Sequence, residues 1–514
     1  MSQQAHGEAD FVERLDRVAS QHADSTAIID GDRALTYAEL TAGIGERAQQ
    51  LADAGLRAGD RVALIAENSA YYLITAFAVW KAGGVLVTIY PASGVADLEY
   101  SIGDSDPVLV LVDEHTDDAV RQAVPADMAL SMIDDRFSVE RVRIDAKPNP
   151  EGLRAPIYLI CYTSGTTSRP KAIMLSAASV LNGADTYGEV WHLGPDDRTI
   201  VCLPMAWLYG LATTSMATLL YGGTVVVLRR ARPELIVDAI ERHGGTFLAG
   251  VTTIFTKLVG HLGRRDRSPD LSSLRLCVSG GEPRNEAAFD RWTSFTGCPV
   301  HDTFCPSECF PLITYDPVAD VVPVPGSAGR LVPRSRLRIV DADGNDVPTG
   351  EVGEALTDGP GMFLGYWGDE EQTKAALTAD GWYRTRDLVR VDESGYVYVV
   401  GRLSDMIIRG GSNVSPAEVE RVLREHPAVR DACVVGLPDE TYGQSVAAAL
   451  VPEDREAEGI DSDALKAFVA SRLASYKVPS AFHVVDRLPQ NTTTGKVDRR
   501  QVATALAEAG AATS

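Results

Sequence analysis

Basic residues are few in this chain of 514 residues, which carries 48 Lys and Arg against 71 Asp and Glu, a formal net charge of −23. An acidic surface repels phosphate backbones and anionic lipid headgroups, so we expect no nucleic-acid partner and no docking on anionic membranes. Small anionic ligands remain compatible with this charge, because they need only a local positive pocket. Apolar residues make up 45% of the chain, which excludes global disorder.

Long hydrophobic runs are also lacking. The stretch 73–80 is too short to cross a bilayer, and Lys81 follows it directly. Residues 1–10 have neither the basic nor the apolar segment of a secretory leader. The sequence therefore predicts a cytoplasmic protein without a membrane span.

Cysteines are scarce, and most of the seven lie in apolar runs such as 276–278 and 432–434. This placement is typical of buried free thiols in a reducing compartment rather than of a disulfide framework. Cys305 and Cys309 are spaced CxxxC, but no His pair follows at zinc-finger spacing. A metal site made by these cysteines is therefore not expected.

The order of apolar patterns predicts an α/β protein. Near-continuous Val, Ile and Leu runs alternate with helical periodicity, which favours mainly parallel sheets covered by helices. Thr36 is a candidate N-cap, because Glu39 completes a capping box. Strands are expected at 27–29, 61–65, 84–88 and 108–112, helices at 11–22, 36–54 and 73–82, and antiparallel hairpins with Gly-containing turns between 336 and 400.

The last part of the chain has the pattern of a separate small α+β domain. Helices are expected at 416–426 and 461–473, and strands at 432–435 and 445–451. The length of the chain fits about three domains, or one large domain and a small one. We place the boundary between 1–403 and 404–514.

The segment 158–171, YLICYTSGTTSRPK, carries the strongest chemical signal. Hydroxyl and backbone N–H groups can surround phosphate oxygens, and Lys171 supplies a positive charge. The segment is not a Walker A loop, because it lacks the second Gly before the lysine and a strand-like run, 172–175, follows it. Taken alone, an ordinary Ser/Thr turn is the alternative.

Together with later segments, this loop resembles the phosphate loop of the adenylate-forming superfamily, which includes acyl-CoA synthetases, adenylation domains and luciferases. The resemblance covers nearly the whole chain. It implies a large N-terminal domain of layered α/β subdomains with a small β-barrel-like subdomain, and a small mobile C-terminal α+β domain. The further motifs, in family order, are VSGGEP at 278–283, FCPSE at 304–308, GEVGE at 350–354, WYRTRD at 382–387, GRLSD at 401–405, RGGSNVSPAE at 409–418 and GK at 495–496.

The resemblance also implies a reaction in two steps. A carboxylate attacks the α-phosphorus of ATP to give an acyl-adenylate and pyrophosphate, and a thiol then attacks the acyl carbon. The carboxylate is already ionised at neutral pH, so the first step needs positioning and charge neutralisation rather than a general base. By resemblance, Lys496 and Lys171 neutralise charge, while Glu308 and Thr166 hold Mg²⁺.

The remaining site residues are assigned by the same resemblance. Phe304 would stack on adenine, and Asp387 would accept hydrogen bonds from the ribose hydroxyls. The alternatives are that Phe304 is an ordinary core aromatic and that Asp387 is an ordinary hairpin residue. Ser404 would be the hinge, and Gly410 and Gly411 form a coenzyme A loop typical of the CoA-using branch. The expected ATP-binding residues are Thr163, Ser164, Gly165, Thr166, Thr167, Gly280, Gly281, Glu282, Pro283, Phe304, Ser307, Asp387 and Arg402, and the expected substrate pocket consists of Trp207, Tyr209, Gly210, Val251 and Cys305.

The residues of the expected pocket and several departures from the family pattern bear on the acid and its acceptor. The aromatic residues Trp207, Tyr209 and Phe304 suggest a small or medium, planar or aryl acid. The acceptor is expected to be coenzyme A, with a carrier-protein thiol or a nitrogen nucleophile as the alternative. A homodimer is left open, and a non-catalytic relative is disfavoured because the charged residues are intact. The departures are Ser168 and Arg386 in place of Gly, Trp207 in place of His, and Cys305, Pro306 and Ser307 in place of Gly-x-Thr.

Overall fold

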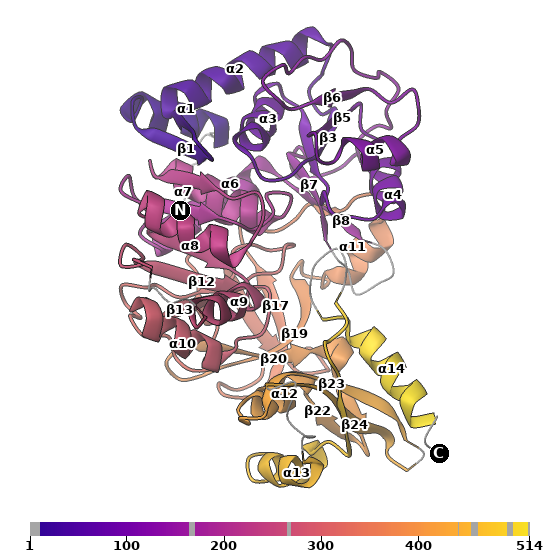
Figure 1. The fold of residues 1–514 in the computed structure, drawn as a ribbon. Helices are drawn as coiled ribbons and strands as arrows, with labels where there is room; N and C mark the ends of the chain where they lie inside the picture. Colours follow the sequence, from indigo (N-terminus) through magenta and orange to yellow (C-terminus); the bar gives the residue numbers. More distant parts are fainter. Residues whose placement is uncertain are drawn as a thin grey trace, which may run out of the picture. The chain divides into compact units, whose positions relative to one another are not determined.

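The computed structural model describes residues 11–163, 170–264, 269–439, 441–453, 461–490 and 497–511. The chain divides into two compact units, which are described separately (Figure 1). The first unit comprises Met1–Gly281, Ala288–Leu337 and Thr357–Tyr383, and the second comprises Glu282–Ala287, Arg338–Leu356 and Arg384–Ser514.

One sheet of the first unit is built mainly from near-continuous apolar strands. In spatial order its strands are β18 (Gly365–Tyr366), β8 (Lys171–Leu175), β7 (Leu159–Thr163), β4 (Val85–Thr88), β3 (Arg61–Ile65), β5 (Leu109–Val112) and β6 (Leu130–Met132). Neighbours from β7 to β6 run parallel, whereas β8 is antiparallel to both β7 and β18. Strands β3, β4 and β5 are fully buried, as their lack of polar alternation predicts.

A second run of strands in the same unit is also mostly parallel. Its spatial order is β15 (Gly329–Leu331), β14 (Ile313–Thr314), β13 (Val300–Phe304), β12 (Leu276–Gly280), β11 (Phe247–Gly250), β9 (Arg198–Val201), β10 (Thr224–Val227), β1 (Thr26–Asp30) and β2 (Arg33–Thr36). Neighbours from β13 to β1 are parallel. The carboxyl ends of these parallel strands therefore share one edge, where ligands bind in open α/β sheets.

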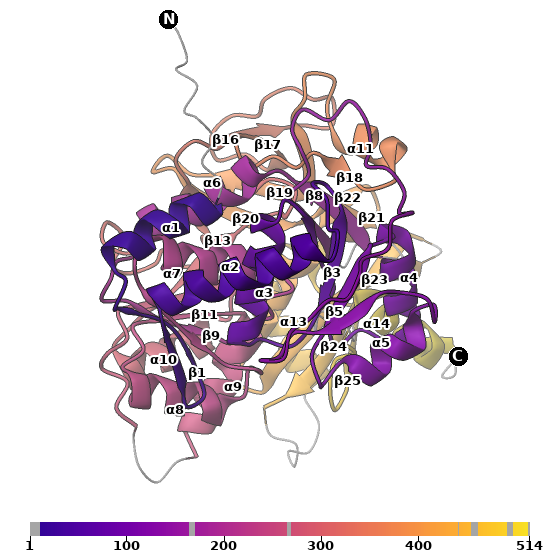
Figure 2. The same ribbon diagram turned by 90° about the horizontal axis from the view of Figure 1, so that it is seen from above.

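Side-chain caps mark the starts of α2 (Tyr37–Asp53), α3 (Ala70–Lys81) and α6 (Ala177–Val190). Thr36 and Glu39 form the predicted capping box of α2. Helix α3 begins before the expected residue 73, because the Ser69 side chain accepts a hydrogen bond from the Tyr72 backbone. Helix α1 (Phe11–Gln21) packs on α2 and α3 (Figure 2). The other helices of this unit are α4 (Val95–Ser105), α5 (Asp117–Ala123), the π-helix η1 (Tyr209–Met216), α7 (Ala217–Leu220), α8 (Pro233–His243), α9 (Thr252–Leu262), α10 (Glu286–Thr296) and α11 (Glu370–Ala376).

The second unit is richer in antiparallel pairing. Its strands, in two groups, are β16 (Arg336–Val340), β17 (Gly353–Asp358), β19 (Tyr383–Val391) and β20 (Tyr396–Arg402), and then β22 (Ser412–Val414), β21 (Ile407–Arg409), β24 (Gly443–Pro452), β23 (Val429–Asp439) and β25 (Ala481–Val484). Its helical elements are η2 (Leu403–Asp405), α12 (Pro416–Arg424), α13 (Ser462–Ala470), η3 (Ser475–Lys477) and α14 (Arg499–Ala511). Helices α12 and α14 both pack on β23.

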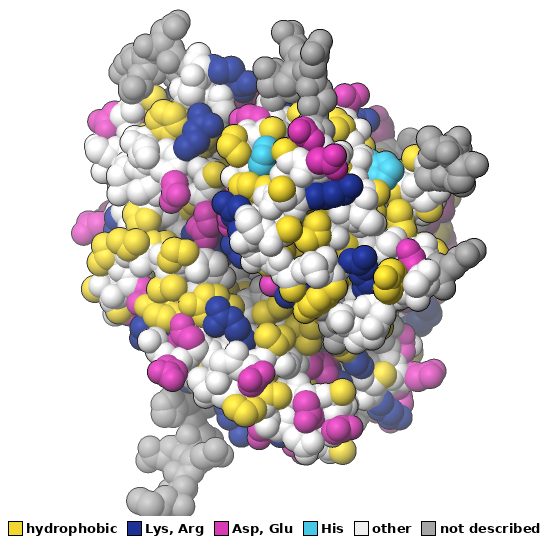
Figure 3. All heavy atoms as spheres, turned by 90° about the horizontal axis from the view of Figure 1, so that it is seen from below, with side chains coloured by type: hydrophobic (Ala, Val, Ile, Leu, Met, Phe, Trp, Pro, Cys, Tyr) yellow, Lys and Arg dark blue, Asp and Glu magenta, His cyan; other side chains and the backbone are white. Residues whose placement is uncertain are grey.

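The predicted α/β fold class is confirmed. On the face drawn in Figure 3, acidic and basic side chains are interspersed rather than separated by sign. Among the described residues, we find no helix with the length and apolar character needed to span a membrane.

Candidate active site

Three predicted site residues lie at the carboxyl ends of neighbouring parallel strands of the first unit. Val251 follows β11, Gly280 ends β12 and Phe304 ends β13. Strand β12 pairs with both β11 and β13, so the fold places these three positions along one edge. Side chains at this edge are positioned by the sheet itself, which makes it a suitable place for ligand contacts.

Gly280 permits a close approach at this edge. A Cβ atom at this position would lie 2.7 Å from Cγ2 of Thr303 and 3.3 Å from Cε1 of Tyr209. Gly281 follows with a φ of 78°, which a residue with a side chain rarely adopts. Gly280 therefore has a steric reason and Gly281 a conformational reason to be glycine, and Gly280 lies beside the ring of a predicted pocket residue.

Tyr209 and Gly210 belong to the π-helix η1, which the sequence analysis did not predict. A Cβ on Gly210 would lie 2.2 Å from the carbonyl oxygen of Pro204. The hydroxyls of Thr214 and Ser215 donate hydrogen bonds to the carbonyl oxygen of Gly210, at 2.8 and 2.7 Å. The Tyr209 hydroxyl donates to the Val278 carbonyl oxygen at 3.3 Å, which ties η1 to strand β12. π-Helical turns of this kind occur frequently at functional sites.

Trp207 has an aromatic neighbour that sequence reasoning missed. Its ring centroid lies 5.1 Å from that of Tyr90, with 31° between the planes. Tyr90 comes two residues after β4, at the carboxyl end of the other parallel sheet. Both side chains are half-buried, so they present aromatic surface at this point. The only signal in the sequence was an aromatic residue shortly after a buried strand.

Glu308 and Lys171 are brought together by a tyrosine that was also not predicted. The Tyr366 hydroxyl donates to Oε1 of Glu308 at 2.8 Å, and the Lys171 ammonium lies 5.1 Å from the centre of the Tyr366 ring. Burial first, and then the Glu308 carboxylate, raise the pKa of Tyr366 and of Tyr383 above the usual value. Both tyrosines therefore keep their protons at neutral pH, and Tyr366 acts as a hydrogen-bond donor to Glu308.

The donor set around Glu308 is compatible with Mg²⁺ bound through a nucleotide. Within the described ranges, no group of three or more His, Cys, Asp or Glu side chains is placed to hold a metal ion. Mg²⁺ is commonly held by one or two carboxylates together with substrate phosphates, rather than by a cage of protein ligands. A single carboxylate such as Glu308 fits this mode.

Cys305 and Ser307 lie half-buried between Phe304 and Glu308. Burial raises the pKa of the Cys305 thiol above its usual value. The thiol is therefore protonated at neutral pH, and Cys305 contributes surface to the candidate pocket rather than a nucleophilic thiolate.

Asp387 and Arg402 form a pair in the second unit. They face each other in the β19–β20 ladder, and Arg402 Nε lies 3.1 Å from Asp387 Oδ1. The Asp387 side chain is 5% exposed, whereas that of Arg402 is 51% exposed. Thr385 Oγ1 accepts a hydrogen bond from the Asp387 backbone at 3.0 Å, which fixes the backbone of Asp387.

The predicted hinge and coenzyme A loop are also in the second unit. Ser404 lies in the short helix η2, where its hydroxyl donates to Oδ1 of Asp405 at 3.0 Å. Gly410 and Gly411 connect β21 to β22, with φ angles of 56° and 81°. Two positive φ angles are the geometry of a two-residue type I′ hairpin turn, for which Gly is favoured.

Some predicted residues receive no structural test. Ser164, Gly165, Thr166, Thr167 and Lys496 lie outside the described residues, as does the side chain of Thr163. Glu282 and Pro283 follow Gly281 and belong to the second unit.

Comparisons with known proteins agree with the resemblance. The sequence profile of the AMP-binding enzymes matches residues 15–367, and that of the AMP-binding enzyme C-terminal domain matches 418–496. The chain is 36% identical to a feruloyl-CoA synthase from an Amycolatopsis species, over 95% of this chain and 97% of the relative. It is 34% identical to an indoleacetate–CoA ligase from Aromatoleum aromaticum, over 95% of this chain and 97% of the relative.

Two solved structures are similar over nearly their whole length. ATP-bound MatB from Rhodopseudomonas palustris has a TM-score of 0.86 and 30% identity, covering 98% of this chain and 100% of that one. The amide bond synthetase McbA from Marinactinospora thermotolerans has a TM-score of 0.85 and 28% identity, covering 96% and 99%. The predicted resemblance is thus confirmed: the chain belongs to the family of AMP-binding enzymes and is an AMP-forming acid–CoA ligase or a related adenylate-forming ligase.

Proposed function

We propose that this enzyme activates a planar, aryl-bearing carboxylic acid with ATP and transfers the acyl group to coenzyme A. The observation that carries the choice of acid is the aromatic pair formed by Trp207 and Tyr90 at the candidate pocket. Flat aromatic surfaces favour flat ligands, through offset or edge-to-face contacts. Two relatives that cover nearly the whole chain are named for acids with aromatic rings, ferulate and indoleacetate.

We assign each group of the nucleotide to its own residues. Lys171 supplies positive charge for the phosphates, and Glu308, oriented by Tyr366, would hold Mg²⁺ with Thr166. A bound Mg²⁺ supplies charge neutralisation at the phosphate oxygens. Asp387 would accept the ribose hydroxyls, since its carboxylate is already oriented by Arg402. Adenine would lie between the 280–283 turn and Phe304.

For the second half-reaction we assign the hairpin at Gly410 and Gly411 to coenzyme A. Without side chains, this turn allows a thiol-bearing arm to approach the backbone closely. The hinge at Ser404 would separate the domains 1–403 and 404–514. By rotation at this hinge, Lys496 would act in the first half-reaction and the hairpin in the second. All seven cysteines lie in the described ranges as free thiols, which suits the cytoplasm as the compartment.

An acid panel tests the proposal. ATP–pyrophosphate exchange should appear with planar aryl acids and be weak with straight-chain acids of equal carbon number. Adding coenzyme A should then give one thioester for each AMP released. Release of AMP and pyrophosphate without any thioester would disprove the acceptor, and exchange that prefers straight-chain acids would disprove the acid class.

A nitrogen nucleophile is the second candidate acceptor. The observation that favours it is the similarity to the amide bond synthetase McbA, over 96% of this chain. Omission of coenzyme A discriminates the two acceptors: steady AMP release that depends on an added amine, with amide as the product, would support this candidate over the first. A carrier-protein thiol is tested in the same assay with a carrier domain as the acceptor.

A further inference from the structure

The hairpin β7–β8, together with β18, presents two different faces. Successive strand residues point to opposite sides of a sheet. Cys161, Ile173 and Tyr366 belong to the larger buried cluster, whereas Ala172 and Trp367 belong to a second cluster, against which Tyr162 packs. Lys171 shares the parity of Ile173 and lies over the ring of Tyr366. Ala172, next to Lys171, and Trp367, next to Tyr366, therefore lie on the opposite face of the sheet from the Lys171–Tyr366 pair.

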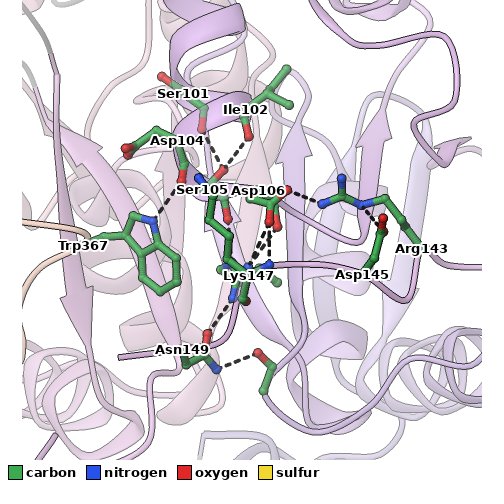
Figure 4. Close-up of polar contacts among 12 residues, drawn as sticks. Ser101, Ile102, Asp104, Ser105, Asp106, Arg143, Asp145, Lys147, Asn149 and Trp367 are labelled. Atoms are coloured by element: carbon green, nitrogen blue, oxygen red, sulfur yellow. Dashed lines mark hydrogen bonds and ion pairs between the residues drawn. The ribbon is translucent and has the colours of Figure 1, made fainter. Parts of the chain in front are cut away.

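The neighbours on this opposite face are held by the last turn of α4. The Tyr162 hydroxyl lies 2.8 Å from Oδ2 of Asp104 and 3.0 Å from the carbonyl oxygen of Ser101. Trp367 Nε1 donates to the carbonyl oxygen of the same Asp104 at 3.0 Å (Figure 4). The Trp367 backbone donates to the Ala172 carbonyl oxygen at 2.9 Å, and Ala172 faces Tyr162 in the ladder. Asp104 thus binds Tyr162 of β7 and Trp367, which follows β18, and Trp367 in turn binds Ala172 of β8, the residue next to Lys171.

The turn that carries Asp104 is itself fixed on its other side. Arg61, with a side chain only 2% exposed, donates to the carbonyl oxygens of Ser105 and Asp106 at the end of α4. Its guanidinium carbon also lies 4.5 Å from the centre of the Trp367 ring. Asn149 joins this arrangement by accepting a hydrogen bond from Arg61 at 2.6 Å. A cation at a helix C-terminus is favourable, so Arg61 stabilises this end of α4.

We propose that Asp104, Tyr162 and Trp367 are positioning residues for the Lys171–Tyr366–Glu308 cluster and so set the affinity of the enzyme for the phosphate end of ATP. None of the three needs to touch the nucleotide. Tyr162 and Trp367 are each adjacent in sequence or register to residues of the cluster, and Asp104 binds both. This inference rests on the proposed role of the cluster in ATP binding.

The variant Tyr162→Phe tests it, because it removes one hydroxyl and keeps the packed ring. We expect the dissociation constant of MgATP, measured by calorimetry without acid, to rise about threefold to tenfold, the range of one lost hydrogen bond. The KM for the acid should stay within about twofold, because the pocket at Trp207 belongs to other elements.

Tyr221→Phe is the matched control. The Tyr221 hydroxyl lies 3.2 Å from the carbonyl oxygen and 3.3 Å from Oδ1 of Asp185, so the deletion is chemically the same at a place remote in the topology from β7 and β8. It should leave ATP affinity unchanged even where it lowers the melting temperature. Equal ATP affinity in wild type and Tyr162→Phe, or an equal loss in both variants, would overturn the inference.

Two further variants keep the test decisive if Tyr162→Phe folds poorly. Trp367→Phe removes the indole N–H and should weaken ATP binding, whereas Asp104→Asn keeps an oxygen acceptor for Tyr162 and should bind ATP nearly as wild type does. A wild-type affinity in Trp367→Phe would contradict the inference. Failure of the wild-type enzyme to bind MgATP at all would instead contradict the proposed function, so the two failures are distinguishable.

Discussion

At the scale of single residues, Arg386 shows the consequence of a departure from the family pattern. Its φ of 62° lies in the left-handed region, which costs a residue with a side chain about 1–3 kcal/mol. The Gly expected from the resemblance would adopt this conformation without strain. Arg386 Nε lies 3.8 Å from Oε1 of Glu354, and the other oxygen of this carboxylate binds Arg384 at 2.9 Å. The backbone next to Asp387 therefore keeps the conformation that Gly would permit, despite the side chain.

Trp207 is the residue at which we expect acid preference to be decided. Replacing Trp207 by Ala removes the aromatic contact with Tyr90 and the flat surface that goes with it. The ratio of kcat/KM for a planar aryl acid to that for a straight-chain acid of equal size should fall about twofold to tenfold, because aromatic pairs contribute about 0.5–1.5 kcal/mol beyond their buried area. The measurement is initial-rate kinetics with the two acids in parallel.

Trp207→Phe is the control for this prediction, because it keeps an aromatic ring and should retain most of the preference. An equal loss of activity toward both acids in Trp207→Ala would show that Trp207 supports the fold or the common chemistry instead of selecting the acid.

At the scale of elements, the sequence predicted what depends on local pattern. The buried strands β3 and β8 and the capped helix α2 follow from apolar runs and side-chain caps. The π-helix η1 has no periodicity that marks it, and β25 pairs in parallel with a strand distant in sequence.

Site residues whose contacts depend on the pairing of distant segments could not be predicted from the sequence either. Glu308 and Lys171 were found through motifs, but Tyr366 was not, because its contacts with them arise only when β18 pairs with β8. Tyr90 was missed for the same reason, since its contact with Trp207 joins segments far apart in the sequence.

The Glu420 carboxylate, which links α12 to β23 and α14, leads to a prediction about the pH dependence of stability. Glu420 of α12 accepts a hydrogen bond from the Val434 backbone at 2.8 Å and is paired with Arg499 of α14 and with Arg424. Burial alone would raise the pKa of Glu420, but Arg499, Arg424 and the hydrogen bonds lower it below the usual value. This contribution to stability is present above the unfolded pKa of about 4.3 and is lost as pH falls through the lower folded pKa.

Glu420→Gln should therefore destabilise the second unit at neutral pH by about 1–3 kcal/mol, because it removes the buried carboxylate that Arg499 and Arg424 share, while these arginines keep their pairs with Asp405 and Asp431. It should also flatten the loss of stability in acid. Hydrogen exchange at β23 amides is the suitable measurement, because all six tryptophans lie in the first unit and fluorescence would report on that unit.

Glu425→Gln is the matched control for the pH prediction. Glu425 pairs with Arg421 at 2.6 Å, but its side chain is 43% exposed, so the loss should be at most about 1 kcal/mol. If both variants change exchange at β23 equally, the buried pairing of Glu420 is not what stabilises this unit.

At the scale of the whole molecule, the proposed roles are divided between two units. Lys171 and Glu308 belong to the first, while Asp387, Arg402 and, by sequence, Lys496 belong to the second. A chain with a net charge of −23 must supply positive charge locally if it is to bind ATP, and we propose that these lysines and Arg402 supply it. In the proposed reaction, Lys496 is needed only while charge develops at the α-phosphorus.

Lys496→Ala tests whether this lysine acts only in the first half-reaction. Pyrophosphate exchange should fall about 100- to 1000-fold, the effect of removing one group that stabilises transition-state charge. The dissociation constant of MgATP should change by less than about threefold, because Lys171 and Glu308 remain. Thioester formation from supplied acyl-adenylate and coenzyme A should persist, since that step attacks the acyl carbon. Lys466→Ala, which removes an exposed lysine of α13, should leave both half-reactions unchanged. Loss of both half-reactions to the same extent in Lys496→Ala would mean that this lysine acts throughout the cycle, and survival of pyrophosphate exchange would mean that another residue stabilises the first transition state.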